Sequence, residues 1–456
     1  MIATLPARTG ATDATRLDAL LAGARFWPAE PQSIQDLGLP EPFVESLITK
    51  LLFASGSRIG RKIAAEICVP FTLVEPILDR LRNRRHISHS GSGPFNDFVY
   101  ALTEEGCRRA RSELEESAYV GPAPVPLSDY VNSVDAQAIA DEPIRRPDLL
   151  EAFRDVSLSP ELFDLLGPAV NSASGLFLYG APGNGKSTLA RGLTKCFGQE
   201  IWLPAAFIEG RDIVKIFDAA YHHEVPVDEA EHAADGAYDR RWLRVRRPTV
   251  IVGGELTMDS LEINPNRTTN VSEAPLQLKS NCGCLLIDDF GRQRISPVDL
   301  LNRWIVPLEN RRDFLTLPAG KKICVPFEQL IIFSTNLDPD DLVDEAFLRR
   351  IRYRIEVRDP DEAEFHALFQ LAADQAGCSY NQTAVEHLLE KYYRPVQRPL
   401  RRCHPRDLLQ QVRHYCTYND LPFEMLAEFF DRVAPGFFTS VRPQLPRNRA
   451  ERATHD

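Results

Sequence analysis

The sequence contains no long apolar run, and none of its hydrophobic stretches approaches the ~20 residues that span a bilayer. The N-terminal segment also lacks the pattern of a signal peptide. Charged residues between Arg8 and Asp18 precede only the short apolar run 20–22. We therefore expect a soluble, cytoplasmic protein that is not inserted into a membrane.

Basic residues are not in excess either. The 53 Lys and Arg residues are outnumbered by 64 Asp and Glu residues, so the net charge is -11 and the pI is about 5.5. This balance excludes a protein whose whole surface coats nucleic acid or an anionic membrane, and any such contact must be local. The nine cysteines show no zinc pattern, because neither Cys282–Cys284 nor Cys403–His404 has a second ligand pair at the required spacing.

The composition is otherwise that of a folded globular protein, with 44% hydrophobic and 26% charged residues. A chain of 456 residues exceeds what one core usually organises, so two or three domains are expected. The sequence shows no internal repeat. We predict a mobile or loosely packed leader at 1–40, a winged helix-turn-helix domain at 41–118, a Pro-rich linker at 119–143, an α/β core at 144–358, a helical lid at 359–435 and a tail at 436–456.

The winged-helix prediction rests on the order of elements between residues 41 and 118. Apolar residues from Val44 to Leu52 recur at helical spacing, and a second short helix and a third helix follow. A capping box at 72–75 predicts the start of the third helix. Two strands then flank the turn 91–94, and Thr103 opens a last helix. The proline-rich segment 120–126 is typical of a stiff spacer.

The region 144–358 alternates apolar, strand-like runs with helical stretches, which predicts a parallel sheet covered by helices on both faces. From about residue 360 the period is purely helical. The predicted fold class is therefore α/β, a P-loop NTPase sheet with a helical lid.

A phosphate-binding loop follows the short apolar strand 176–179 and precedes a helix. This is the Walker A pattern in its required context, where backbone N–H groups and a helix N-terminus meet the phosphates. Lys186 is predicted to contact the β and γ phosphates, and the Ser187 hydroxyl to bind Mg²⁺. The predicted ATP-binding residues are Gly180, Pro182, Gly183, Asn184, Gly185, Lys186, Ser187 and Thr188.

Polar residues also follow two other apolar strands. Asp288 and Asp289 come directly after the strand 284–287, which is the Walker B arrangement. Asp288 is predicted to hold Mg²⁺ and Asp289 to orient or deprotonate the attacking water. Asn336 follows the apolar run that begins at residue 330.

These motifs, in this order, resemble those of the AAA+ ATPase superfamily over roughly residues 144–433. The resemblance implies sensor 1 at Asn336, sensor 2 at Arg406, with Arg401 and Arg402 as near alternatives, and an arginine finger within 344–351. Arg350 is the first choice for the finger and Arg349 the second. A finger acts on a neighbouring subunit, so the resemblance implies a homo-oligomeric ring, with a hexamer as the expected form. Most AAA+ proteins have Glu where Asp289 stands, so we expect either slow hydrolysis or a displaced water that compensates for the shorter side chain.

The subfamily is open. A hairpin predicted at 314–327, before the sensor strand, resembles that of MoxR-type ATPases, enhancer-binding proteins and replicative helicase relatives. A long insertion precedes Walker B, and within 242–264 the run Val250–Val252 and the pair Gly253–Gly254 suggest an extra hairpin. Such inserts commonly engage the substrate. The residues 286–291, in contrast, look more like those of helicase loaders and transposition helpers.

The partner is open as well. Residues 58–85 hold seven basic and three acidic residues, which suits phosphate contacts and favours DNA slightly over a protein partner. We expect an ATPase that remodels or loads DNA or a protein complex. The alternative is a nucleotide-switched, DNA-binding regulator with slow ATPase activity.

Overall fold

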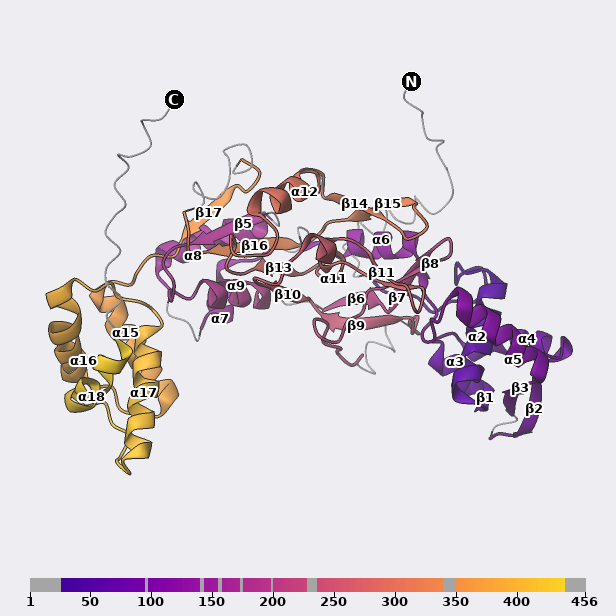
Figure 1. The fold of residues 1–456 in the computed structure, drawn as a ribbon, viewed down its shortest axis with the longest axis horizontal. Helices are drawn as coiled ribbons and strands as arrows, with labels where there is room; N and C mark the ends of the chain where they lie inside the picture. Colours follow the sequence, from indigo (N-terminus) through magenta and orange to yellow (C-terminus); the bar gives the residue numbers. More distant parts are fainter. Residues whose placement is uncertain are drawn as a thin grey trace, which may run out of the picture. The chain divides into compact units, whose positions relative to one another are not determined.

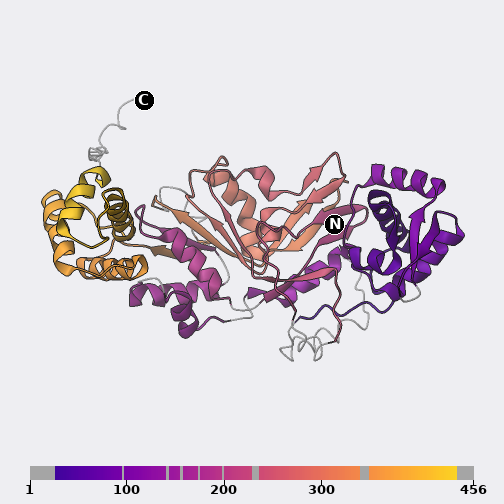
Figure 2. The ribbon, with the colours of Figure 1, turned by 90° about the horizontal axis from the view of Figure 1, so that it is seen from below.

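The structure is a computed structural model that describes residues 26–94, 97–139, 143–154, 158–172, 175–197, 200–227, 236–338 and 349–438. The chain divides into two compact units. The first contains Pro160–Tyr179, Ser187–Glu356 and the residues up to Phe153, and the second contains Arg154–Ser159, Gly180–Lys186 and the residues from Val357 onward. Figures 1 and 2 show their helices and strands in two views.

The first unit is built on a five-stranded parallel sheet, as predicted. Apart from the edge strand Tyr353–Glu356, its strands are nearly continuous apolar runs, because both faces of a parallel sheet are covered. Their order in the sheet is β10 (Thr249–Val252), β13 (Cys284–Ile287), β16 (Leu330–Thr335), β5 (Gly175–Tyr179) and β17 (Tyr353–Glu356). The sensor strand β16 thus separates the strand that leads into the Walker A loop from the strand that leads into Walker B.

Helix α12 (Pro297–Asn310) covers one face of this sheet and α9 (Lys186–Lys195) lies on the other (Figure 1). Ser296 caps α12 by accepting a hydrogen bond from the Asp299 N–H. The indole of Trp304 is fully buried in one cluster with Phe177 and Phe333. Two further helices, α7 (Arg146–Ala152) and α8 (Pro160–Asn171), come directly before β5 in the chain.

The prediction of an extra hairpin at 250–254 is wrong. Val250–Val252 belongs to β10, which pairs in parallel with β13 at the edge of the main sheet. The glycine pair that suggested a hairpin turn instead follows the carboxyl end of this strand. A buried parallel strand and a hairpin strand have the same short apolar signature, so the pattern alone could not separate them.

Four of the five strands of a second sheet come from the insertion that precedes Walker B. Its order is β11 (Asn264–Asn266), β12 (Val271–Glu273), β8 (Asp212–Lys215), β7 (Ala206–Glu209) and β4 (Val125–Pro126). A two-stranded antiparallel sheet of β6 (Glu200–Pro204) and β9 (Trp242–Arg246) packs in one hydrophobic cluster with β7 and β8 of this sheet. The 3₁₀ helix η2 (Met258–Leu261) and α11 (Leu276–Lys279) complete the insertion.

The segment predicted as a linker is largely part of this core. Residues 125–126 form β4, and α6 (Leu127–Ala136) follows directly. Tyr130 of α6 is fully buried and stacks on Phe207, with ring centroids 5.6 Å apart. The prolines before residue 127 exclude only a helix up to that point, and the apolar side chains beyond it determine the packing.

The predicted hairpin before the sensor strand is present as β14 (Arg312–Thr316) and β15 (Lys322–Pro326). Leu315, Ile323 and Val325 bury its inner face in the cluster of the second sheet. Its outer face carries Phe314, which is 57% exposed and lies opposite Cys324.

Residues 41–116 form a helical subdomain with a small antiparallel sheet of order β1-β3-β2. Its elements are α2 (Glu41–Ser55), β1 (Arg58–Ile59), α3 (Gly60–Glu66), α4 (Phe71–Asn83), β2 (Ile87–Ser92), β3 (Phe98–Leu102) and α5 (Glu104–Glu116). Thr103 caps α5 as expected. The capping box at 72–75 is wrong, because α4 begins earlier with Pro70 as N-cap residue, which leaves Thr72 inside the first turn.

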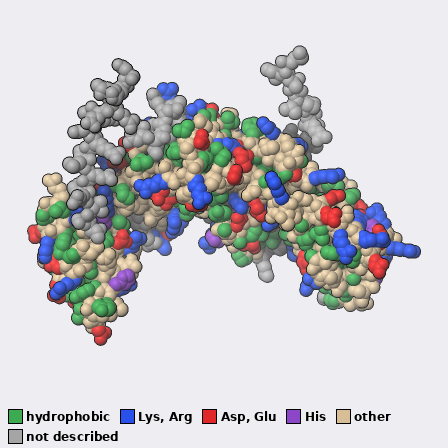
Figure 3. Space-filling model, in the orientation of Figure 1, with side chains coloured by type: hydrophobic (Ala, Val, Ile, Leu, Met, Phe, Trp, Pro, Cys, Tyr) green, Lys and Arg blue, Asp and Glu red, His purple; other side chains and the backbone are tan. Residues whose placement is uncertain are grey.

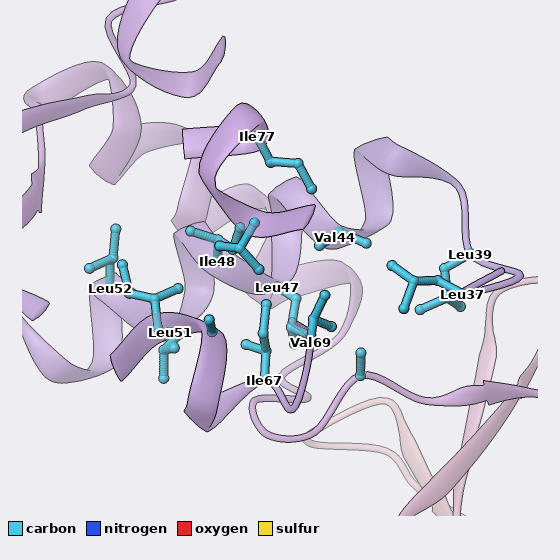
Figure 4. Packing of buried hydrophobic residues seen from close by; sticks show 14 of the residues in the cluster. Leu37, Leu39, Val44, Leu47, Ile48, Leu51, Leu52, Ile67, Val69 and Ile77 are labelled. Carbon is cyan, nitrogen blue, oxygen red and sulfur yellow. The ribbon is translucent and has the colours of Figure 1, made fainter. Parts of the chain in front are cut away.

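The core of this subdomain continues into the second sheet. Figure 4 shows Leu47, Ile67 and Val69 packed together, and Ile208 and Val271 of the sheet belong to the same cluster. The predicted leader is wrong for residues 26–40, since Leu37 is fully buried and Phe26 packs edge-on against Trp242. Residues 1–25 of that prediction lie outside the described residues.

The second unit is helical beyond residue 361, with a core that includes Phe365, Phe369, Leu408 and Phe430. Its elements are α15 (Glu362–Ala376), α16 (Gln382–Leu388), the π-helix η3 (Leu389–Tyr393), the 3₁₀ helix η4 (Arg394–Val396), α17 (His404–Tyr418) and α18 (Ala427–Phe437). The predicted tail lies outside the described residues from position 439 onward.

Among the described residues, no helix combines the length and apolar character needed to cross a membrane. All nine cysteines are free thiols.

Candidate nucleotide site

The carboxyl ends of β13 and β16 bring four of the predicted site residues into two contacting pairs. Ser187 donates a hydrogen bond from Oγ to Asp288 Oδ2 over 2.6 Å. Asn336 donates from Nδ2 to Asp289 Oδ1 over 3.1 Å. Asp289 and Asn336 meet because the carboxyl ends of the neighbouring parallel strands β13 and β16 lie at one edge of the sheet, whereas Ser187 comes from the first turn of α9. We name Ser187, Asp288, Asp289 and Asn336 the strand-end group.

The turn after β13 holds Asp289 in an unusual backbone conformation. Its φ is 51°, in the left-handed region that Asp and Asn tolerate better than longer side chains. The adjacent Phe290 N–H donates to Ser334 O over 2.7 Å, and Thr335 Oγ1 donates back to Phe290 O over 2.9 Å. This backbone conformation favours a short side chain such as Asp at position 289.

The predicted phosphate loop, Gly180–Lys186, belongs to the second unit. Gly180 and Gly183 have φ values of 137° and 86°, which L side chains rarely adopt. A Cβ at Gly180 would also lie 2.5 Å from Val357 O. The Lys186 ammonium is nearly buried and donates to Gly180 O and Ala181 O, both over 3.0 Å. The lysine thus curls back over its own loop.

Asn184 connects this loop to the segment that follows β17. Its side chain is 1% exposed and donates from Nδ2 to Asp359 Oδ1 over 2.6 Å and to Val357 O over 3.3 Å. Its Oδ1 accepts a hydrogen bond from the Arg402 N–H over 3.4 Å. The sequence identified Asn184 as a loop residue but did not identify these partners.

The side chains present fit a nucleotide with Mg²⁺. Ser187 Oγ and Asp288 Oδ2 are oxygen donors of the kind that this hard cation prefers. Mg²⁺ usually keeps several waters and takes only one or two protein ligands, so a denser cluster is not required. In the part of the chain that the structure describes, no group of three or more His, Cys, Asp and Glu side chains could hold a metal ion.

The predicted arginine finger lies at a basic cavity of the first unit. Arg350 Nε donates to Glu309 Oε1 over 2.7 Å. A cavity of about 420 Å³ is lined by Ser172, Leu308, Glu309, Arg349, Arg350 and Arg352. Residues 344–348 of the predicted finger segment lie outside the described residues. Both candidate arginines line this cavity, so the geometry leaves the choice between them open.

The three candidate arginines of the lid have different surroundings. Arg406 is 73% exposed and pairs with its neighbour Asp407 over 3.0 Å. Arg402 pairs with Glu364 over 3.0 Å. Arg401 pairs with Asp359, and its stem lies against Gly183, where an added Cβ would be 3.7 Å from Arg401 Cβ. The structure therefore brings Arg401, and not the first choice Arg406, against the phosphate loop.

Sequence reasoning missed Asp359. This carboxylate follows β17 by three residues, so the rule that found Asp288 and Asn336, a polar residue just after a strand, was an available signal. The proline that follows Asp359 and the start of a helical pattern obscured it.

Comparison with known proteins gives few matches by sequence and several by structure. A family model described as a domain of unknown function (DUF8689) matches residues 361–435, which lie within the second unit. No curated protein matches the sequence.

NtrX from Brucella abortus is 15% identical with a TM-score of 0.39, and the match covers 64% of this chain but only 57% of the NtrX chain. A variant of RuvB from Thermotoga maritima is 14% identical with a TM-score of 0.37, covering 62% and 71% of the two chains. A third structure, the Thermotoga maritima RuvB Holliday junction branch migration motor, is 13% identical with a TM-score of 0.34, covering 65% and 70%.

Proposed function

We propose that this protein is an ATPase of the AAA+ type that hydrolyses ATP with Mg²⁺ to remodel or load a macromolecular partner. The observation that carries the proposal is the strand-end group. A hydroxyl from the start of the Walker A helix contacts the Walker B carboxylate, and the sensor amide contacts the second carboxylate. A glycine-rich turn that matched the Walker pattern by chance would have no reason to be joined to these two strand ends.

The roles of the residues follow from their chemistry. Lys186 supplies a positive charge for the β and γ phosphates when it leaves the carbonyl oxygens of Gly180 and Ala181. Ser187 and Asp288 hold Mg²⁺, which neutralises phosphate charge when bound. Asp289 accepts a proton from, or orients, the attacking water, and Asn336 fixes the Asp289 carboxylate.

We further propose that the active form is a homo-oligomeric ring, with a hexamer as the expected form. An arginine finger has to reach the phosphates of a neighbouring subunit, where it stabilises the charge of the transition state. Arg350 is 27% exposed and pairs with Glu309, which is half-exposed and accessible to solvent. An exposed ion pair of this kind is weak enough to exchange for a phosphate.

The partner of the subdomain 41–116 is better explained as protein than as DNA. Four of the seven basic residues in 58–85 pair with carboxylates of the same subdomain: Arg58 with Glu66, Arg80 with Glu41, Arg82 with Asp79 and Arg84 with Glu45. The N-terminus of α3, which would suit a phosphate, is occupied by the Asp97 carboxylate, which accepts hydrogen bonds from the Gly60 and Arg61 N–H groups.

Much of the positive charge that suggested DNA is thus neutralised within the subdomain. On the face shown in Figure 3, acidic and basic side chains are interspersed. We therefore favour a winged-helix domain that docks a protein. Binding to duplex DNA that weakens steeply with added salt would reverse this preference.

The test of the ATPase proposal compares the purified chain with its Lys186→Ala variant. We expect Mg-dependent ATP hydrolysis by the unchanged chain, and loss of ATP binding in the variant because the phosphates lose their main cationic partner. Lys195→Ala, the same substitution at an exposed position of the same helix, serves as the matched control. Unaltered ATP affinity of Lys186→Ala in a titration would sink the assignment of this loop.

A further inference from the structure

Within the second unit, the phosphate loop is held by two segments that are distant in sequence. Residues 357–359 contact it through Asn184 and Gly180, and residues 401–403 contact it through the Arg402 and Cys403 N–H groups. The Cys403 N–H donates to Gly183 O over 2.9 Å. Residues of the second unit at 357–359 and 401–403 therefore determine the conformation of a loop that has to accommodate three phosphates.

Asp359 is the point at which these contacts converge. Its Oδ1 atom accepts hydrogen bonds from both Asn184 Nδ2, over 2.6 Å, and the Arg401 guanidinium. The Arg401 side chain is 20% exposed and that of Asp359 is 39% exposed, so the pair is accessible to solvent and to ligand. A single carboxylate oxygen thus links the loop to the lid arginine.

The neighbouring arginines do not share this arrangement. Arg402 pairs with Glu364, and Arg406 pairs with Asp407. Arg401 alone among the three lies with its stem against Gly183 and with its charge on a carboxylate that also holds Asn184.

We propose that Asp359 is a positioning residue that sets the preference of this site for ATP over ADP. The inference rests on the proposed ATPase function. Asp359 competes with the γ phosphate for the Arg401 guanidinium. A phosphate carries more negative charge than a carboxylate and offers more acceptor oxygens, so ATP takes the arginine from Asp359. ADP lacks the γ phosphate and leaves the Arg401–Asp359 pair in place.

Asp359→Asn separates the two contacts of this carboxylate. The amide oxygen still accepts the hydrogen bond from Asn184, whereas the charge that attracts Arg401 is gone. We expect about 1.5- to 5-fold tighter binding of a non-hydrolysable ATP analogue and little change for ADP, a range set by the modest strength of solvent-exposed ion pairs. Asp359→Glu restores the charge and should return the ratio toward that of the unchanged chain.

Glu364→Gln is the matched control, because it removes the partner of the adjacent Arg402 and should leave the ATP-to-ADP affinity ratio unchanged. Equal effects of Asp359→Asn on both nucleotides, or none on either, would overturn the inference while leaving the ATPase proposal intact. Failure of the unchanged chain to bind either nucleotide would instead remove the proposed function itself. If Asp359→Asn does not fold, Arg401→Gln tests the same pair from the other side, with loss of ATP preference expected and an unchanged ratio contradicting the proposal.

Discussion

The strand-end group and the phosphate loop are supported in different ways. Asp288, Asp289 and Asn336 stand directly after strands of a parallel sheet, so the backbone hydrogen bonds between those strands set their spacing. The phosphate loop is instead held by side chains, notably Asn184 and its partner Asp359. The sheet thus holds Asp288, Asp289 and Asn336 in place through backbone hydrogen bonds, whereas the loop depends on a hydrogen bond to one charged side chain, Asp359.

The largest expected effect is on ATP hydrolysis and comes from Arg350, which belongs neither to the strand-end group nor to the phosphate loop. We expect Arg350→Ala to keep nucleotide binding and to lose about 10³-fold or more in hydrolysis, because a finger stabilises only the transition state. Mixing Arg350→Ala with Lys186→Ala should restore some activity, since the intact arginine of one subunit serves the intact loop of the next. Steady-state ATPase assays of each variant and of the mixture measure this.

Arg349→Ala is the informative comparison, as both residues line the same cavity. A loss in Arg349→Ala with full activity in Arg350→Ala would move the finger by one residue. Sedimentation that shows a monomer in ATP, with specific activity independent of protein concentration, would remove both the ring and the finger.

A smaller effect is expected within the strand-end group. Asp289→Asn should still bind Mg-ATP but hydrolyse it at least ~100-fold more slowly, the low end of general-base contributions. The left-handed backbone at this position tolerates Asn, so folding should be preserved. Single-turnover hydrolysis measures the effect, and an unchanged rate would place the base elsewhere. With ATP bound, the same variant is suited to capture of the partner.

The smallest expected effect concerns the stability of the protein at low pH. It involves His404, which follows the loop-contacting residues Arg402 and Cys403 in the chain. Burial lowers the pKa of His404 to about 4, with Arg401 as a further cause. The unfolded chain binds this proton near pH 6.5, so the neutral histidine contributes stability that is complete above about pH 6.5 and falls as the pH drops toward 4. The contribution is at most about 2 kcal/mol once screening by solvent is included.

His404→Gln should therefore give a shallower fall of the melting temperature between pH 7 and pH 4.5 than the unchanged chain. The amide can still accept the hydrogen bond that His404 Nδ1 shares with Tyr393 Oη. Thermal unfolding followed by circular dichroism measures the slope. Equal slopes for the two proteins would show that this histidine does not titrate in that range.

The sequence was sufficient for the parallel sheet and the strand-end group because each depends on a local signal. An apolar run followed by a polar side chain predicts a buried strand and a polar residue at its carboxyl end, as at Ile287 and Asp288. The hairpin 312–326 was equally local. Val250–Val252 was misassigned because its neighbours Gly253 and Gly254 suggest a turn, and only its pairing with β13 reveals a sheet strand.

Contacts between distant segments could not be read in this way. The link from Asn184 to Asp359 spans 175 residues, and the choice of Arg401 over Arg406 depends on which side chain reaches the loop. Packing of residues 26–40 and of α6 against the second sheet was missed for the same reason, because proline content is informative about backbone conformation and uninformative about burial.

Strand β4 and helix α6 also determine where the chain can be cut. A fragment that begins at residue 144, the border suggested by the sequence, would lose the edge strand next to β7 and the ring that fills the space beside Phe207. The exposed edge of β7 would then be free to pair with other copies, which favours aggregation during expression. A fragment that is to retain the second sheet should therefore start before Val125 and include Tyr130.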